Sequence, residues 1–267
     1  MKDLAGVYYF NGDYRIPITL SYTENGNIKA DLGEDYGTFN KETSKVYFEN
    51  IGKGELKGSD LNFQGYSWKK DNRKYLLFIG ANRMHEINDY VNDYHSGLFI
   101  EPIPFVFDML LENLDKTKKF NTNYKGINAL VTSESGKEYD FNVFSNTGAS
   151  SSIYKPNPKE WKWPKAKVTE TIKLKSKTIK EIIEEEKWEN LKYDVVLDVQ
   201  GAELEVMKGF GTHLNNINKI TVEVSKKAYY NGGVLFTDLN DFFVNNGFKL
   251  LSNKIADHDN IIYILNK

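Results

Sequence analysis

Hydrophobic and polar positions follow different patterns in the two parts of the chain. Up to about residue 72, short runs of β-branched and aromatic residues alternate with polar ones between glycines, as in "IPITLSYTENGNIKADLG". This alternation is typical of short strands with one buried face. The pairs Asn11-Gly12 and Asn25-Gly26 favour type I′ hairpin turns, because both central residues of that turn need positive φ. The sequence therefore predicts a small antiparallel β domain over residues 1–72.

From about residue 73 onward, apolar runs alternate with segments of helical spacing. Strands that are apolar on both faces and separated by helices imply a parallel sheet covered on both sides. Residues 73–267 are therefore expected to form an α/β domain. The predicted strands are 74–80, 97–103, 126–132, 193–200 and 217–225, with 140–145 as an added hairpin arm and 248–252 and 260–267 as a closing hairpin. The predicted helices are 81–94, one beginning at Pro104, one beginning at Thr178 with a capping box to Glu181, a short one after Gly201, and one from Thr237 to Gly247.

Composition narrows the classes of partner. Of the 267 residues, 40% are apolar and 27% are charged, and the formal net charge is −2. A protein that holds a nucleic-acid backbone usually has a basic excess, so no nucleic-acid partner is expected. Cysteine is absent, which excludes disulfides and thiolate metal sites. The four histidines lack metal-ligand spacing and His258 is expected in a surface turn, so no metal is predicted.

Candidate chemistry lies just after the predicted strands. An open parallel sheet binds ligands beyond the carboxyl ends of its strands. Gly80, after the first strand of this half, lets the backbone turn sharply and approach a ligand. Glu101 ends the next strand, where a carboxylate can accept hydrogen bonds from both hydroxyls of an adenosine ribose. This pair indicates an adenosine-containing cofactor, and by itself leaves NAD and S-adenosylmethionine both open.

Motifs along the second half resemble those of a known family. "FIGANRMHEI", "FIEPIPFVFDMLLENL", "SNTGASSSI", "LDVQGAELEVMKGFG" and "ITVEVS" occur in the order found in FkbM-type S-adenosylmethionine-dependent methyltransferases. The resemblance implies a Rossmann-like class I methyltransferase fold, with a seven-stranded mixed sheet and an antiparallel last strand. It also implies S-adenosylmethionine as cofactor, S-adenosylhomocysteine as product, and methylation of hydroxyls on small molecules and sugars. The chain departs from the family pattern at Phe78-Ile79, where an acidic residue is common, and at Met84, where glycine is frequent.

The resemblance assigns cofactor contacts by position. Gly80, Ala81 and Asn82 are expected to face the methionine part, and Glu101 with Pro102 the ribose. Asn128 and Ala129 are expected at the adenine edge, and Asp198 and Gln200 at the cofactor crevice.

A sugar hydroxyl is too weak an acid to ionise alone at neutral pH, so a positioned base is expected. Asp198 is the first candidate and Glu223 the second; Asp198 could instead orient the cofactor. Ser151, Tyr229 and Tyr230 are candidates for binding the acceptor, whereas Glu203 is expected to be structural.

The preferred hypothesis is an O-methyltransferase acting on a sugar hydroxyl in a glycan, such as a deoxyhexose. The aromatic-rich β domain favours it, because aromatic faces bind sugar rings; the alternative for this domain is a scaffold or dimer-forming role. The alternatives are a glycan-binding protein with an inactive methyltransferase-like domain and, more weakly, an NAD-dependent oxidoreductase. The domain order is also similar to methyltransferase regions of large-virus sugar-transfer proteins. This similarity implies that the chain could be part of a longer multidomain protein. No run reaches signal-peptide or membrane-span length, so a cytoplasmic location is expected, that of the host if the protein is viral.

Overall fold

The computed structural model describes residues 6–10, 17–23, 28–30, 35–40, 43–48, 52–57, 60–63, 66–251 and 254–266. The chain divides into two compact units. One comprises Met1–Arg73 with Val91–His95 and Thr117–Thr122. The other comprises Lys74–Tyr90, Ser96–Lys116 and Asn123–Lys267. Within the described ranges, no helix is both long enough and apolar enough to cross a membrane.

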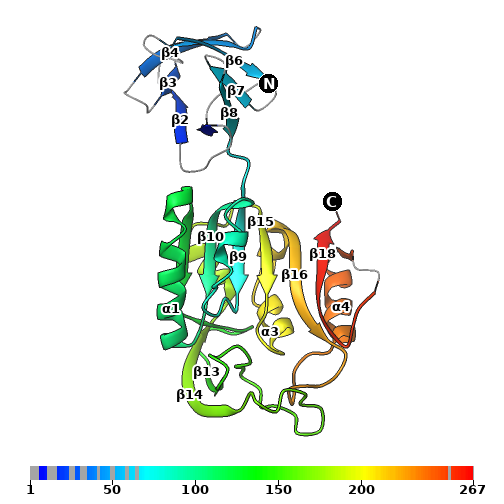
Figure 1. Cartoon of the computed structure of the whole chain (residues 1–267). Helices are drawn as coiled ribbons and strands as arrows, with labels where there is room; N and C mark the ends of the chain where they lie inside the picture. The colour runs from blue at the N-terminus through cyan, green and yellow to red at the C-terminus, as the bar shows by residue number, and fades with distance from the viewer. Residues whose placement is uncertain are drawn as a thin grey trace. The chain divides into compact units, whose positions relative to one another are not determined.

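Eight strands of the first unit form a closed antiparallel barrel, which begins in blue in Figure 1. Each strand pairs with the next along the chain, and the first pairs with the last to close the barrel. Alternation is clear in Lys45–Phe48, where Val46 and Phe48 are buried. The predicted turn pairs Asn11-Gly12 and Asn25-Gly26 lie outside the described residues. The strands are β1 Gly6–Phe10, β2 Pro17–Tyr22, β3 Ile28–Ala30, β4 Asp35–Asn40, β5 Lys45–Phe48, β6 Gly52–Lys57, β7 Asp60–Phe63 and β8 Tyr66–Lys70.

A buried arginine links distant segments inside this first unit. The guanidinium of Arg73 donates to Asp71, to the Tyr9 hydroxyl and to the carbonyl oxygens of Val91, Phe120 and Asn121. The side chain of Arg73 is only 1% exposed and that of Asp71 10%. Burial opposes ionisation of Asp71, but the hydrogen bonds and charge of Arg73 outweigh it and lower the pKa of this carboxyl.

The second unit is built on a seven-stranded sheet, in the order β11-β10-β9-β15-β16-β18-β17. Strands β9, β10, β11, β15 and β16 run parallel, and β18 is antiparallel to both β16 and β17. Strands β10 and β15 are buried on both faces, as their continuous apolar runs predict. The predicted seven-stranded mixed sheet with an antiparallel last strand is therefore confirmed. The strands are β9 Lys74–Ile79, β10 Tyr94–Ile100, β11 Asn123–Ile127, β15 Tyr193–Leu197, β16 Ile217–Ser225, β17 Phe248–Leu250 and β18 His258–Leu265.

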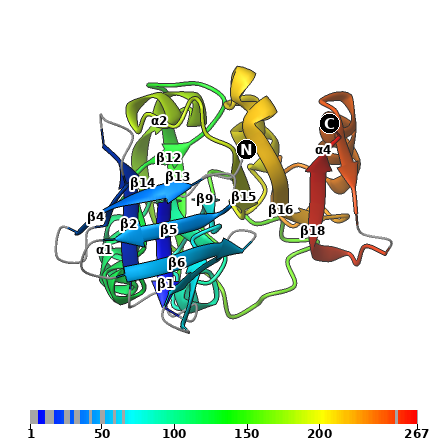
Figure 2. The ribbon, with the colours of Figure 1, turned by 90° about the horizontal axis from the view of Figure 1, so that it is seen from above.

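The α-helices of the second unit lie between its strands along the chain. Figures 1 and 2 both show α1 and α4 toward opposite ends of the sheet. The capping box predicted at Thr178 is present: its hydroxyl accepts the Glu181 N–H, and the Glu181 carboxylate accepts the Thr178 N–H. The α-helices are α1 Pro104–Asp115, α2 Ile179–Glu185, α3 Glu203–Lys208 and α4 Phe236–Asn245, and the 3-10 helices are Ile87–Asp89, Lys118–Phe120 and Gly211–Asn216.

Three predictions about this unit were wrong. The predicted helix 81–94 is a series of turns with a single 3-10 helix, because Asn82 and Met84 adopt left-handed φ values of 47° and 48° that interrupt a right-handed helix. The predicted strand 126–132 is two strands in different sheets, β11 and β12 Leu130–Val131. A long strand that the pattern did not predict, β14 Val168–Lys177, joins β12 and β13 Glu138–Phe144 in a separate three-stranded sheet.

Candidate active site

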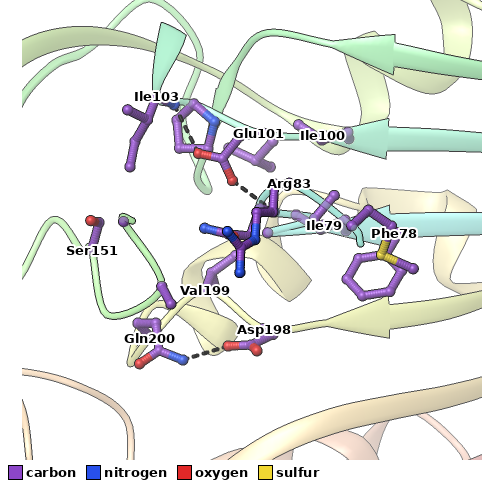
Figure 3. A pocket seen from close by; sticks show the side chains of 18 of the residues that line it. Phe78, Ile79, Arg83, Ile100, Glu101, Ile103, Ser151, Asp198, Val199 and Gln200 are labelled. Atoms are coloured by element: carbon purple, nitrogen blue, oxygen red, sulfur yellow. Dashed lines mark hydrogen bonds between the residues drawn. The ribbon is translucent and has the colours of Figure 1, made fainter. Parts of the chain in front are cut away.

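A cavity of about 290 Å³ opens at the carboxyl ends of β9, β10 and β15. Figure 3 shows labelled side chains from all three strand ends arranged around it. The sequence analysis predicted the cofactor-binding residues at this edge of the sheet. Of the predicted cofactor residues, all but Asn128 line the cavity: Gly80, Ala81, Asn82, Glu101, Pro102, Ala129, Asp198 and Gln200.

The turn after β9 requires a glycine. Gly80 has φ +82°, and a Cβ at this position would lie 1.8 Å from the backbone oxygen of Asp198. The Gly80 and Ala81 N–H groups both donate to the Ile100 carbonyl, at 3.0 and 2.9 Å. The loop is therefore held against β10 and β15 at a distance that no side chain permits.

Glu101 is 4% exposed, and both of its carboxylate oxygens are held. One accepts the Asn82 N–H and the other the Ile103 N–H, each at 2.9 Å. Burial raises the pKa of Glu101 to about 7, against the lowering effect of these two hydrogen bonds. Asn128 does not line the cavity, and its side-chain amide donates to the carbonyls of Glu101 and Pro102.

Several residues around the cavity have unusual backbone conformations. Asn82, Met84, Thr147 and Gln200 all line it and all have positive φ, between 47° and 56°. Such conformations cost about 1–3 kcal/mol each in a non-glycine residue, and they cluster at functional sites. Met84 thus adopts a left-handed backbone conformation that is strained for a residue with a side chain, whereas a glycine adopts it without strain.

Two carboxyl groups from neighbouring strands meet beside the cavity. The Gln200 amide nitrogen donates to Asp198 Oδ1 at 2.5 Å and to Glu223 Oε2 at 2.7 Å. Burial, and next the charge of Glu223, raise the pKa of Asp198 well above its usual range. Figure 3 shows Asp198 and Gln200 linked at the carboxyl end of β15.

Glu203 holds the loop between these residues. Its carboxylate accepts the N–H groups of Val199 and Gly201, at 3.2 and 3.1 Å. The residue is 3% exposed, and burial raises the pKa of its carboxyl to about 7. These contacts agree with the structural role expected for Glu203.

His258, which was expected in a surface turn, completes the carboxyl cluster. His258 Nε2 lies 3.0 Å from Glu223 Oε1, and its Nδ1 lies 2.8 Å from the Ser225 hydroxyl. The side chain of His258 is 21% exposed, so it is not the surface-turn residue that was expected. Ser225 and His258 are paired directly in the antiparallel register of β16 and β18. No sequence spacing could have indicated this pairing, because it depends on that register.

The three predicted acceptor residues are buried. Ser151 is 7% exposed, and its hydroxyl accepts the Phe144 N–H. Tyr230 is 6% exposed and hydrogen-bonds to Gln200 Oε1 at 2.8 Å, and its pKa is raised by burial. Tyr229 is 4% exposed and packs edge-to-face with Trp163 and His258.

A second cavity of about 20 Å³ lies on the far side of the Gln200–Gly201 turn. Glu203, Glu223, Tyr229, Tyr230 and His258 line it. A space of this size holds about one water molecule or one hydroxyl group. The carboxyl cluster therefore stands between the large cavity and a small polar one.

The large cavity fits an adenosine cofactor with an amino-acid tail. Gly80 supplies close backbone approach, and Glu101 supplies a buried carboxyl at the next strand end. Apolar side chains, among them Leu130, Phe141 and Ile153, line the same space and suit a purine ring. In the described part of the chain, no group of three or more metal-ligating side chains is arranged to hold a metal ion.

This fold and site define the class as an α/β protein with a cavity at the carboxyl ends of its parallel strands. The family model described as "Methyltransferase FkbM domain" matches residues 79–250. The chain belongs to the FkbM methyltransferase family, and its cofactor is S-adenosylmethionine. No curated protein matches the sequence.

Among solved structures, the chain is similar to methyltransferase FkbM from Methylobacillus flagellatus KT, with 13% identity and a TM-score of 0.45 over 72% of this chain and 43% of that chain. It is also similar to a putative tRNA methyltransferase of Streptococcus pneumoniae in complex with S-adenosyl-L-methionine, with 9% identity and a TM-score of 0.37 over 73% of this chain and 67% of that chain. TrmK of M. capricolum, in complex with S-adenosyl-homocysteine, shares 10% identity with a TM-score of 0.33, over 73% of this chain and 64% of that chain. The chain thus spans less than half of the Methylobacillus protein.

Proposed function

We propose that this chain transfers a methyl group from S-adenosylmethionine to a hydroxyl group of a sugar in a glycan. The observation that carries the proposal is the pair of carboxyls of Asp198 and Glu223, which Gln200 bridges and of which Asp198 lines the cofactor cavity. A hydroxyl acceptor requires a base that takes up its proton, and a carboxylate of such a pair can serve as that base. When bound, the cofactor supplies an electrophilic methyl group on a positively charged sulfur.

Methylation of a hydroxyl releases one proton. The new carbon–oxygen bond forms as the carbon–sulfur bond breaks, the sulfur keeps that electron pair, and the oxygen–hydrogen bond must be given up. Glu223 is the better placed base, because it lines the small polar cavity, which holds about one hydroxyl group, and contacts His258 there. In this assignment Asp198 holds Gln200 in place and disperses charge across the pair.

His258 gives the proton a way out of the site. Its imidazole contacts Glu223 on one side and Ser225 on the other, and it is more exposed than Glu223, at 21% against 16%. Imidazole can take up and release a proton near neutral pH without large rearrangement. The acid pair and His258 together can return the site to its starting charge after each turnover.

Aromatic side chains beside the carboxyl cluster support a sugar as the acceptor. Trp163 packs edge-to-face against both Tyr229 and His258, and Trp161 packs against Tyr230. Lys162 lies over the rings of Trp163 and Tyr229, at 4.6 and 4.7 Å from their centroids. Aromatic and cationic groups of this kind suit the apolar faces and hydroxyls of a saccharide.

A screen of methyl transfer tests the proposal. Wild-type protein with S-adenosylmethionine is incubated with a panel of deoxyhexose and hexose glycosides, and products are analysed by mass spectrometry. We expect the gain of one methyl group on at least one glycoside, greatly reduced in Glu223→Gln and in Asp198→Asn. Binding of S-adenosylhomocysteine without transfer to any saccharide would contradict the proposal and favour a glycan-binding protein with an inactive methyltransferase-like domain.

A further inference from the structure

Arg83 stands out among the residues around the cofactor cavity. It follows Asn82 in the turn after β9, and its side chain lines the cavity. In the view of Figure 3, Arg83 lies between the carboxyls of Glu101 and Asp198. Neither the Asp198–Glu223 pair nor the carboxyl of Glu101, the residue expected to bind the ribose, gives this guanidinium a role.

The backbone around Arg83 is fixed on both sides. Asn82 donates its N–H to Glu101 and its side-chain amide to the Thr147 carbonyl, at 2.9 Å each. The Arg83 carbonyl accepts the Asn113 amide at 2.7 Å, and Met84 beyond it is 1% exposed. Asn82 and Met84 both hold left-handed conformations, so the turn that presents Arg83 to the cavity is strained and tightly held.

The guanidinium of Arg83 makes no hydrogen bond or ion pair with any residue that the structure describes. The nearby carboxyls are already engaged by other donors. Glu101 accepts two backbone N–H groups, Asp198 accepts the Gln200 amide, and Glu223 is shared by Gln200 and His258. Five N–H donors in a planar fork are thus left facing the cavity.

A planar cationic fork matches a carboxylate or a phosphate with two parallel hydrogen bonds. S-adenosylmethionine carries one such group, the carboxylate at the end of its methionine part. Glu101, the residue expected to bind the ribose, accepts the Asn82 N–H, and Arg83 is the next residue of the same turn. Phe78 and Met84, which line the same cavity, offer no charge to this end of the cofactor.

We propose that Arg83 binds the carboxylate of the methionine part of the cofactor by charge-assisted hydrogen bonds. This inference rests on the proposed function, the transfer of a methyl group from S-adenosylmethionine. It makes Arg83 a determinant of cofactor choice in this chain, since a nucleoside without a carboxylate tail gains nothing from it.

Isothermal titration of two ligands into three proteins tests the inference. The ligands are S-adenosylhomocysteine and its decarboxylated form, which lacks only the carboxylate. The proteins are the wild type, Arg83→Gln and Arg83→Lys. A control, Lys249→Gln, removes one exposed positive charge from β17 at the far edge of the sheet.

We expect Arg83→Gln to weaken S-adenosylhomocysteine binding about tenfold or more, and Arg83→Lys to weaken it less, because Lys keeps the charge without the fork. Affinity for the decarboxylated ligand should not fall in either variant, and Lys249→Gln should change neither affinity. Equal weakening of both ligands, or unchanged binding of S-adenosylhomocysteine to Arg83→Gln, would overturn the inference; the latter is expected if Arg83 instead binds an anionic acceptor. Failure of both ligands to bind the wild type would instead refute the proposed function.

Discussion

At the scale of single residues, the turn after β9 depends on one glycine. Gly80→Ala would place a Cβ 1.8 Å from the Asp198 backbone oxygen at φ +82°, so the loop must move. We expect a loss of at least about 3 kcal/mol in the free energy of unfolding, together with loss of S-adenosylhomocysteine binding. Urea unfolding and calorimetry measure the two effects.

Gly136→Ala is the matched control for Gly80→Ala. Gly136 has a similar φ of +75°, but nothing lies within 4 Å of the Cβ that would be added. This variant should lose only about 1 kcal/mol from the left-handed conformation and keep its ligand affinity. Equal losses in the two variants would show that φ, and not the close approach to β15, makes Gly80 necessary.

The proton path through His258 gives a second residue-scale prediction. His258→Ala removes the imidazole that contacts Glu223 and Ser225. We expect kcat to fall about tenfold or more, with KM and S-adenosylhomocysteine affinity nearly unchanged, and added imidazole to restore part of the loss. A loss of turnover that imidazole does not restore would assign His258 a packing role beside Trp163 and Tyr229.

At the scale of elements, the first turn of α3 carries two glutamates with opposite electrostatics. Burial raises the pKa of Glu203 to about 7 from an ordinary 4.5, whereas the Ser133 hydroxyl and then Lys208 lower that of Glu205. The folded protein thus binds the Glu203 proton more tightly than the unfolded chain. The contribution of Glu203 to stability is therefore fully present below about pH 4.5 and is lost as pH rises to about 7, by up to about 3 kcal/mol.

Glu203→Gln should therefore flatten the fall in the free energy of unfolding between about pH 4.5 and 7, since the amide oxygen can still accept the Val199 and Gly201 N–H groups. Some dependence should persist, because the pKa of Glu101 is also raised to about 7. Glu205→Gln should act in the opposite sense and remove stability that is present at neutral pH. Urea unfolding across this pH range checks both variants, and an unchanged slope in Glu203→Gln would contradict the assignment.

The elements also show what sequence patterns can and cannot predict. Gly80, Glu101 and Asp198 were predictable because parallel strands bring their carboxyl ends to one edge of the sheet, whatever the detailed packing. The turn at residues 81–94 was mistaken for a helix because the left-handed Asn82 and Met84 are set by tertiary contacts to Glu101 and the core. Strand β14 was not predicted because most of its residues are polar and exposed, and a polar sequence of this kind is typical of a loop. His258 meets Glu223 only through the register of β16 and β18.

At the scale of the whole molecule, the Arg73 network ties sequence-distant segments of the first unit together. Arg73→Met would leave the Asp71 carboxylate and several carbonyl oxygens without their buried partner. We expect a loss of about 3–5 kcal/mol in the free energy of unfolding. Lys125→Met is the control, because it breaks an exposed pair with Glu186 that is worth less than about 1 kcal/mol.

Thermal or urea unfolding compares the two variants. Similar small losses in Arg73→Met and Lys125→Met would show that the buried network contributes little to the stability of this unit.

The central claim is that the cavity at the ends of β9, β10 and β15 holds S-adenosylmethionine beside the Asp198–Glu223 pair. Calorimetric titration of the wild type, Gly80→Ala and Glu223→Gln with S-adenosylhomocysteine tests it most directly. We predict one binding site per chain in the wild type, retained in Glu223→Gln and lost in Gly80→Ala. No binding to the wild type at millimolar ligand would contradict the account.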